Sequence, residues 1–324
     1  GRLEFQSEVT IRGGYTADFE GRDVDRYQSR IVVRGWLNGV VGCYFDSDYG
    51  EPPRPVGLDG LVFDIALGDR FPETGESSRV LINLDGASAA TVENCTIQIT
   101  TGGEFNRGLT AVCVGGSPNY DYSTPAARII LRNNTILAVS ENGEDMTGLS
   151  VERLEPGGGH EVWGNRMMVQ GGKATGLYLD GAQGVLVANN VISVRGGQDS
   201  PSGGMAVGID CQRELMSGAI VHNTIVFDSP DSERGIWLHN AYSESTCDME
   251  VINNIVAGYD GDGSEAIGND NGTTHDPFYD YNVCFGVDTE GAGTHGIYGS
   301  NNGYSTSDLF WDVFGEDWDL DLSN

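Results

Sequence analysis

One short sequence element recurs seven times between residues 92 and 283, and this repeat restricts the possible folds more than any other feature of the chain. Each copy places apolar residues on both sides of a short polar stretch that usually contains asparagine. The first polar positions are Asn94, Asn133, Asn165, Asn189, His222, Asn253 and Tyr281, separated by 39, 32, 24, 33, 31 and 28 residues. A spacing that varies above a minimum predicts a bare coil of about two dozen residues, with the excess inserted as loops.

A second element, glycine followed by an apolar residue, alternates with the first and begins at Gly108, Gly148, Gly176, Gly208 and Gly235. Both elements are short and alternate apolar with polar residues, and nothing between them has a helical period long enough for a crossover helix. A βαβ fold is therefore excluded, and propellers, hexapeptide helices and leucine-rich repeats fit the spacing or composition less well. The repeat predicts an all-β, right-handed parallel β-helix of about eight coils. We expect an N-terminal cap with the first strands over 1–57, coils over 58–284 and a C-terminal cap over 285–324.

The two most characteristic residue types have physical roles in such a solenoid. The chain contains 48 glycines in 324 residues, and glycine accepts the positive φ that tight turns between strands require. Asparagine tolerates left-handed backbone, and its amide can hydrogen-bond to the coils above and below. The repeat therefore predicts asparagines stacked at one corner of the coil.

The two ends of the chain resemble those of a known group of proteins. The opening segment Val9-Thr-Ile-Arg-Gly-Gly-Tyr15, followed by Phe19 and Arg22-Asp23, is similar to the start of many secreted or surface-exposed bacterial right-handed parallel β-helix proteins. Asp280-Tyr-Asn-Val283, Asp308-Leu-Phe310 and Trp318-Asp-Leu320 are similar to their closing segment. The resemblance implies a pectate-lyase-like superfold and a secreted or cell-surface location, and it carries no activity.

Charge excludes two classes of partner. The chain has 48 acidic residues against 18 basic ones, a formal net charge of −30, and Lys173 is its only lysine. Such a surface repels nucleic acid and anionic headgroups. Since no apolar stretch of about 18 residues is present, we also expect no membrane insertion.

Alternation along the second element predicts which side chains face outward. Apolar residues one and three positions after the glycine face inward, so the positions between them form a strip across successive coils. The strip pairs are Thr110/Val112, Ser150/Glu152, Tyr178/Asp180, Asp210/Gln212 and Trp237/His239. Aromatic rings stack on sugar faces while carboxylates bind hydroxyls, so the candidate ligand-binding residues are Glu152, Tyr178, Asp180, Asp210, Gln212, Trp237 and His239. Lys173, Arg153 and Arg213 are predicted to lie just outside the strip.

Two functions remain open. The chain lacks the Asn-Thr-Asp, Asp-Asp, Gly-His-Gly and Arg-Ile-Lys motifs of polygalacturonase-like hydrolases, and the strip lacks the basic residue of a lyase. We therefore expect a non-catalytic surface protein with an adhesive, glycan-binding or structural role, whose partner is a polysaccharide, a cell-surface glycan or copies of itself. The alternative is a polysaccharide lyase or glycoside hydrolase. In that case His239 acts as base, Asp210 or Asp180 orients it, and Tyr178 acts as acid.

Calcium is the only metal that the sequence suggests, and no other cofactor is predicted. Asp260, Asp262 and Glu265 offer oxygen ligands in a glycine-rich turn, and Asp46, Asp48 and Glu51 form a second cluster, although neither completes an EF-hand pattern. The histidines lack zinc-site spacing.

The six cysteines allow a limited set of disulfides. The candidate pairings are Cys211 with Cys247, and Cys95 with Cys43 or Cys113. Cys113 and Cys211 are both expected inward but about three coils apart, which is beyond disulfide range.

Overall fold

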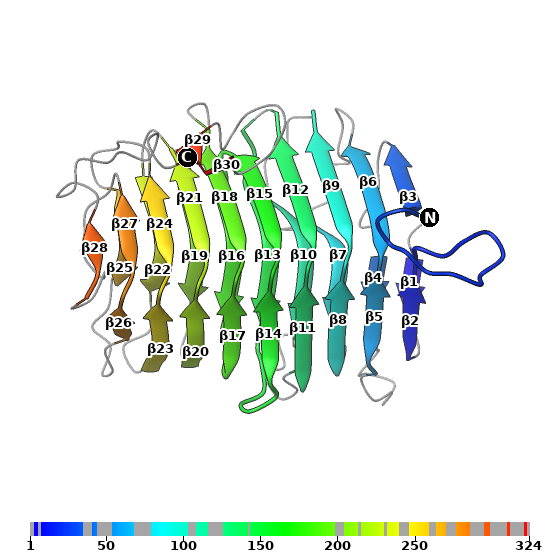
Figure 1. Ribbon diagram of the computed structural model, residues 1–324, viewed down its shortest axis with the longest axis horizontal. Helices are drawn as coiled ribbons and strands as arrows, with labels where there is room; N and C mark the ends of the chain where they lie inside the picture. The colour runs from blue at the N-terminus through cyan, green and yellow to red at the C-terminus, as the bar shows by residue number, and fades with distance from the viewer. Residues whose placement is uncertain are drawn as a thin grey trace.

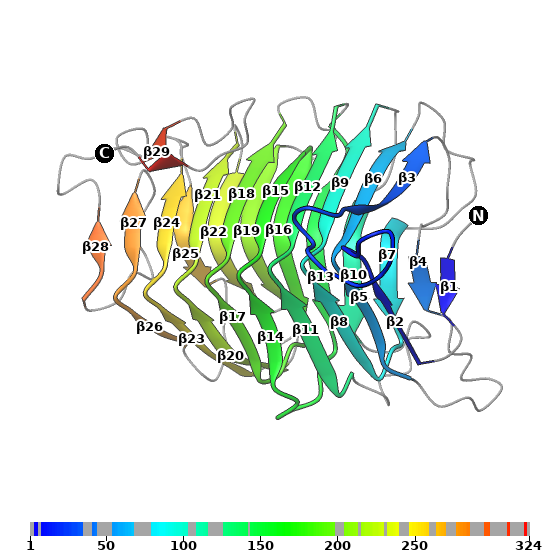
Figure 2. The same ribbon diagram turned by 45° about the vertical axis from the view of Figure 1, so that its right-hand side comes forward.

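The computed structural model is a stack of parallel strands with no helix among the residues that it describes, so the predicted parallel β-helix is confirmed. The described residues are 3–5, 8–34, 41–43, 54–67, 79–102, 108–115, 126–141, 143–197, 204–212, 215–229, 232–239, 246–258, 264–269, 277–285, 295–298, 310–311 and 321–322. Within them, no helix is long and apolar enough to cross a membrane. Figure 1 and Figure 2 show the strands stacked side by side along one axis, with the N-terminal strands at one end and β28 at the other.

Three parallel sheets form the sides of the solenoid, and successive strands of the chain are assigned to them in rotation. Sheet 1 contains β1 (Leu3–Phe5), β4 (Val41–Cys43), β7 (Arg79–Asp85), β10 (Leu109–Gly115), β13 (Met146–Glu152), β16 (Lys173–Asp180), β19 (Met205–Gln212), β22 (Ser232–His239) and β25 (Glu265–Asn269). Sheet 2 contains β2 (Val9–Arg12), β5 (Val56–Asp59), β8 (Ala89–Glu93), β11 (Arg128–Arg132), β14 (His160–Trp163), β17 (Val185–Ala188), β20 (Leu215–Val221), β23 (Thr246–Ile252) and β26 (Phe278–Asp280). Sheet 3 contains β3 (Ser29–Arg34), β6 (Leu61–Leu67), β9 (Thr96–Thr101), β12 (Thr135–Ser140), β15 (Arg166–Gly171), β18 (Val191–Gly196), β21 (Thr224–Asp228), β24 (Ile255–Gly258), β27 (Val283–Phe285) and β28 (Ile297–Tyr298).

A short antiparallel pair, β29 (Phe310–Trp311) and β30 (Asp321–Leu322), lies outside the three sheets. In the described part of the chain, the regular coils number about six rather than the predicted eight. The predicted extents of the caps stay predictions.

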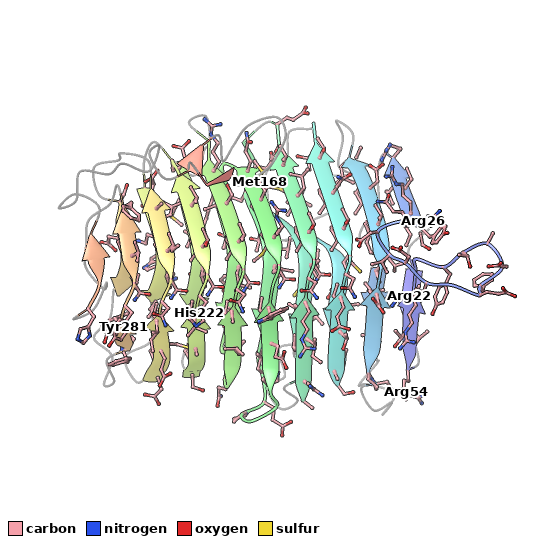
Figure 3. All side chains as sticks on the ribbon, viewed as in Figure 1. Arg22, Arg26, Arg54, Met168, His222 and Tyr281 are labelled. Atoms are coloured by element: carbon pink, nitrogen blue, oxygen red, sulfur yellow. The ribbon has the colours of Figure 1, made fainter. Side chains whose placement is uncertain are left out.

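The corner between sheets 2 and 3 divides the two predicted roles of asparagine between consecutive residues. The first corner residue has left-handed backbone, with φ of 53° at Asn133 and 57° at His222. The next residue is buried and belongs to a ladder whose members are Asn134, Asn165, Asn190, Asn223, Asn254 and Asn282. Figure 3 places His222 and Tyr281 at this corner, on coils where the left-handed residue is not asparagine.

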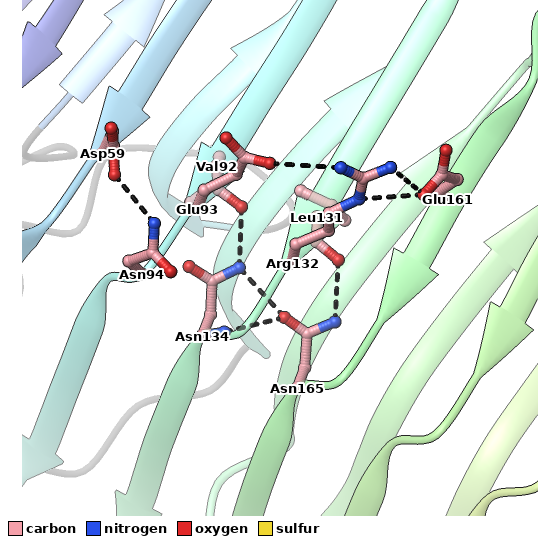
Figure 4. A network of polar contacts seen from close by, with 9 residues as sticks. All are labelled: Asp59, Val92, Glu93, Asn94, Leu131, Arg132, Asn134, Glu161 and Asn165. Carbon is pink, nitrogen blue, oxygen red and sulfur yellow. Dashed lines mark hydrogen bonds and ion pairs between the residues drawn. The ribbon is translucent and has the colours of Figure 1, made fainter.

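The ladder amides from Asn134 to Asn254 each bond both to the next amide and to a backbone carbonyl. Asn134 donates from Nδ2 to Oδ1 of Asn165 at 2.9 Å and to the carbonyl of Val92 at 2.8 Å, and its backbone N–H donates to the same Oδ1 at 3.1 Å. The pattern repeats from coil to coil, as Figure 4 shows for two of them. The ladder therefore satisfies buried backbone groups that the corner would otherwise leave without partners.

The ladder corrects the predicted alignment of one repeat. Asn165 was expected to align with Asn133, but Arg166 pairs with Thr135, so Asn165 aligns with the buried Asn134. The left-handed position of that coil belongs to Gly164, with φ of 66°. A glycine replaced asparagine at the first corner position, and the sequence comparison therefore shifted by one residue.

Apart from the ladder, apolar side chains fill most of the interior of the described coils. The predicted inward residues of sheet 1, among them Leu149, Leu177, Ile209 and Ile236, are at most 1% exposed. Gly176 and Gly208 in this sheet have no positive φ, and a Cβ on either would clash with a core isoleucine of sheet 3. Some of the glycines thus serve close packing between sheets rather than turns.

Candidate functional site

The candidate site lies on the outward face of sheet 1, where side chains from successive coils form two columns. The first outward column runs Asn83, Cys113, Ser150, Tyr178, Asp210 and Trp237. The second outward column runs Asp85, Gly115, Glu152, Asp180, Gln212 and His239. Since neighbouring parallel strands lie about 4.8 Å apart, side chains in adjacent positions can reach one another.

The strand register aligns the predicted pairs of four coils and shifts the pair of one coil. Cys113, not Thr110, aligns with Ser150, so Cys113 faces outward and Val112 faces inward with no exposed area. The prediction had Cys113 inward and Val112 outward. The prediction counted positions from Gly108, but the register places Ala111, not Gly108, opposite Gly148. Counting from Gly108 therefore assigned the wrong residues of β10 to the outward face.

Asp210 is the centre of a polar network on this face. It is 1% exposed, and its Oδ1 lies 3.0 Å from Nε2 of His239. Gln212 donates from Nε2 to Oδ2 of Asp210 at 3.1 Å and accepts from the hydroxyl of Tyr178 at 3.2 Å. We call Tyr178, Asp210, Gln212 and His239 the Asp210 network; each side chain in it is held by another.

Lys173 completes this surrounding of Asp210. Its Nζ lies 4.0 Å from Oδ2 of Asp210, and its side chain is 33% exposed. Lys173 pairs in register with Met205, outside the two columns, but its ammonium group reaches the strip at Asp210, a contact that was not predicted. The glycine within β16 shifts the alternation by one residue: Leu177 and Ala174 face inward, so Lys173 faces outward. A lysine at an apparently inward position was the signal of that shift.

The expectation of an exposed acidic strip also needs correction. Asp180 is 3% exposed, as buried as a core residue although it belongs to the second outward column. Glu152, Gln212 and His239 are only partly exposed. Asp180 and Asp210 thus lie beneath neighbouring side chains. The groups that a ligand can reach are the partly exposed ones, such as Glu152, Gln212 and His239.

The ring of Trp237 in the strip is already in contact with two neighbouring side chains. The ring of Trp237 stacks on His239 with 3.7 Å between centroids and 16° between planes, and Cζ of Arg234 lies 5.0 Å from the Trp237 centroid. Arg234 also pairs with Glu265. Arg234 and His239 both contact the ring of Trp237. The ring is therefore fixed in place, and it offers a ligand its edge rather than an open face for stacking.

The opposite end of the columns concentrates negative charge. Glu152 accepts hydrogen bonds from the hydroxyl of Ser150 at 2.8 Å and from the thiol of Cys113 at 3.6 Å. Burial, and next the charge of Glu152, raise the pKa of Asp85 to about 7, with Arg153 opposing the shift. Asp85 was not predicted as a site residue, because its repeat element precedes the first recognisable Gly-Leu copy.

The predicted calcium ligands do not assemble in the part of the chain that the structure describes. Glu265 is paired with Arg234, and Ser264 donates to Glu233 at 2.7 Å. The described residues contain no group of three acidic, histidine or cysteine side chains suited to a metal. Asp260 and Asp262, like Asp46, Asp48 and Glu51, lie outside the described residues, so calcium stays a prediction.

The described cysteine side chains are buried free thiols: Cys95, Cys113, Cys211, Cys247 and Cys284. Burial, and next the proximity of Cys247, raise the pKa of Cys211 well above its ordinary value. Burial also raises the pKa of Cys95 and of Cys247 to about 11. The predicted Cys211–Cys247 and Cys95–Cys113 bonds are therefore not formed in the structure, and the Cys95–Cys43 bond stays a prediction because the side chain of Cys43 lies outside the described part.

Comparison with known proteins adds no family to this geometry. No protein-family model, no curated protein and no solved structure matches the chain significantly. The site must therefore be interpreted from its own chemistry.

Proposed function

We propose that the protein is a secreted or cell-surface β-helix protein that binds a glycan on the outward face of sheet 1, over β13, β16, β19 and β22. The observation that carries the proposal is the Asp210 network. Its amide, hydroxyl and imidazole groups are positioned by one another before any ligand arrives, which lowers the entropy lost on binding. Partly exposed groups of this kind suit the alternating donors and acceptors of sugar hydroxyls.

Charge favours a neutral glycan. A protein of net charge −30 repels a polyanion at long range, and Asp180 and Asp210 add negative charge under the site. Lys173 offsets one of these charges locally. We therefore expect neutral polysaccharides to bind more tightly than uronate polymers at low ionic strength.

The test is binding of neutral and acidic polysaccharides to the intact chain, measured by titration calorimetry. Tyr178→Phe removes one hydroxyl and Gln212→Ala removes the amide that links Tyr178 to Asp210. Each substitution should weaken binding roughly two- to tenfold, the effect of one or two hydrogen bonds. Gln98→Ala, an exposed amide on sheet 3, serves as the matched control and should change nothing. Equal affinity of all three variants would contradict the proposal.

A second candidate function rests on the contact between His239 and Asp210. Nε2 of His239 lies 3.0 Å from Oδ1 of Asp210, and a carboxylate oxygen accepts hydrogen bonds, so a neutral imidazole with its proton on Nε2 would leave Nδ1 as the basic nitrogen. A histidine oriented in this way can serve as general base toward a bound sugar. Of the two predicted orienting acids, Asp210 makes this contact.

The two functions differ in turnover. Depolymerisation of a bound polysaccharide that disappears in His239→Gln, while that variant still binds, would establish acid–base catalysis and replace the non-catalytic proposal. Binding without any product release in the wild-type protein would exclude the catalytic candidate.

A further inference from the structure

The outward face of sheet 3 is exposed at one end of the solenoid and buried toward the other. One column of this face runs, strand by strand, through Val32, Asp64, Gln98, Leu137, Met168, Ser193, Val226, Ala257 and Phe285. Val32 is 54% exposed, whereas Val226, the same residue type in the same column, has no exposed area. Met168, which Figure 3 labels, lies between them in the column and is partly exposed. A side chain on an outer face keeps contact with water unless a further segment packs on it, so a segment of the chain covers this column from Ser193 onward.

Ser193, Val226, Ala257 and Phe285 form what we call the covered patch, and each of them is at most 8% exposed. The patch does not belong to the interior: among the described residues, the apolar core contains Ile225, next to Val226 in the strand, but none of the three apolar patch residues. The hydroxyl of Ser193 is buried and has no hydrogen-bond partner within the described part of the chain. Because buried polar groups are almost always hydrogen-bonded, the cover has to supply apolar side chains and a hydrogen-bond partner for Ser193.

The C-terminal elements show where the chain goes after the last strand of sheet 3. That strand, β28, ends at Tyr298, at the far end of the solenoid in Figure 1 and Figure 2. Both views place β29 back near the C-terminal ends of β21 and β24. The distance from β28 to β21 is three inter-strand spacings, about 14 Å, and an extended residue spans about 3.3 Å. Residues 299–309 are therefore long enough to return across β27 and β24.

The composition of residues 299–324 matches what the covered patch requires. The segment contains the apolar residues Leu309, Phe310, Trp311, Val313, Phe314, Trp318, Leu320 and Leu322. It also contains six acidic residues and no lysine or arginine. On the face that it would cover, the outward residues of β15, β18, β21 and β24 include Arg166, Arg195 and one acid, Asp228, which pairs with Arg195 at 3.2 Å. Charge therefore does not oppose an acidic segment on this side of a protein whose net charge is −30.

We propose that residues 299–324 form a strap across the outer face of sheet 3, over β18, β21, β24 and β27, with the covered patch beneath it. The strap lies along a side of the solenoid, whereas an end cap would lie across its last coil. Without the strap, the patch would expose apolar side chains on adjacent strands, a surface that favours association with other molecules. The strap therefore closes this side of the solenoid to partners.

Photo-crosslinking of the full chain tests which segment covers the patch. Thr224 lies two residues before Val226 on the outward face of β21 and is partly exposed, so Thr224→p-benzoylphenylalanine places a benzophenone beside the patch. Irradiation and peptide mapping by mass spectrometry should give intramolecular cross-links into residues 299–324. The matched control is Thr96→p-benzoylphenylalanine, in the same column but on β9, and it should give none. Failure to reach residues 299–324 from position 224, or equal cross-linking from both positions, would overturn the proposal.

A charge placed under the strap provides a second measurement. Val226→Glu should displace the strap, because an unpaired charge is costly to bury. Proteolysis follows the population of the open state, so cleavage within residues 299–324 should become about tenfold faster or more. Val32→Glu, at the exposed end of the same column, is the matched control and should be cleaved like the wild type. Equal cleavage of two variants that circular dichroism shows to be folded would contradict the strap, and if Val226→Glu does not fold, the cross-link alone decides.

Discussion

The asparagine ladder and the second outward column of sheet 1 are both stacks of polar side chains on successive coils, yet they differ in how their members satisfy one another. An amide carries donors and an acceptor, so each ladder asparagine bonds to the next one and to a carbonyl. The second outward column contains Asp85, Glu152 and Asp180, and carboxylates can only accept hydrogen bonds or repel one another. Amides can therefore stabilise a stack by bonding to copies of themselves on successive coils. A column of carboxylates needs hydrogen-bond donors or positive charge from other side chains or from a ligand.

The largest effect is expected where the ladder is broken. Asn190→Ala removes the acceptor for Nδ2 and for the backbone N–H of Asn165, and the donor to the carbonyl of Val162. Leaving several buried groups unsatisfied should cost about 3–5 kcal/mol of unfolding free energy. Urea denaturation followed by circular dichroism measures this loss.

The neighbouring residue provides the control for that measurement. Asn189 is exposed and has φ of 54°, so Asn189→Gly keeps the left-handed backbone and should change stability by a few tenths of a kcal/mol. Equal losses in Asn189→Gly and Asn190→Ala would contradict the division of the corner into a left-handed residue and a hydrogen-bonding residue.

In the second outward column, removing a polar group should raise the stability of the protein, whereas in the ladder it lowers it. The pKa of Asp85 is raised by burial from 3.8 to about 7, so the unfolded chain ionises first and folding stability falls as pH rises from about 4 through 7. Asp85→Asn should therefore stabilise the protein at pH 8, on the order of 3 kcal/mol, and change little at pH 4. Thermal melts across this pH range test the sign.

Asp64 is the contrasting carboxylate. The hydrogen bond from Arg34 lowers the pKa of Asp64, so Asp64→Asn should lose a little stability at pH 8 rather than gain it. A destabilised Asp85→Asn at pH 8 would show that Asp85 is held by a partner and not opposed by Glu152.

The sequence predicted the self-complementary column far better than the other one. The ladder was visible because every coil needs the same residue type at the same corner, and the β-helix fold followed from that repetition. The sequence identified the members of the Asp210 network but not the burial of Asp210. That burial depends on side chains from neighbouring coils, which have no common residue type. The contact of Lys173 with Asp210 was not predicted because Gly176 changes the alternation within one strand, an effect of packing against sheet 3 that no period reveals.

His160 is a buried polar residue that links neighbouring coils by hydrogen bonds, as a ladder asparagine does, but unlike asparagine it can gain a proton. Its Nδ1 accepts from the N–H of Ile129 at 3.1 Å and its Nε2 donates to the carbonyl of Glu155 at 2.7 Å, so the buried ring is neutral. Burial lowers the pKa of His160 below 6.5, despite the favourable effect of Glu155 and with a smaller contribution from Arg128 in the same direction.

The unfolded chain therefore takes up the His160 proton first, and stability should be complete above pH 6.5 and fall as pH drops below that value. The measurement is the melting temperature between pH 8 and 5, in the wild type and in His160→Gln. The glutamine variant should lose this part of the pH dependence. His222→Asn, at an exposed corner position, should retain the whole wild-type profile, and a flattened profile there would assign the titration to the wrong histidine.

The smallest effect is expected for the ion pairs of Arg132 on sheet 2. Arg132 lies between Glu93 and Glu161 and pairs with both, as Figure 4 shows, but its side chain is 35% exposed. Solvent weakens such pairs, so Arg132→Met should cost about 0–1 kcal/mol and should lose even this at high salt. A loss comparable to that of Asn190→Ala would mean that these ion pairs between coils stabilise the stack as strongly as the amides do. The small expected value follows from exposure: an ion pair at the surface replaces good contacts with water, whereas the ladder amides satisfy groups that water does not reach.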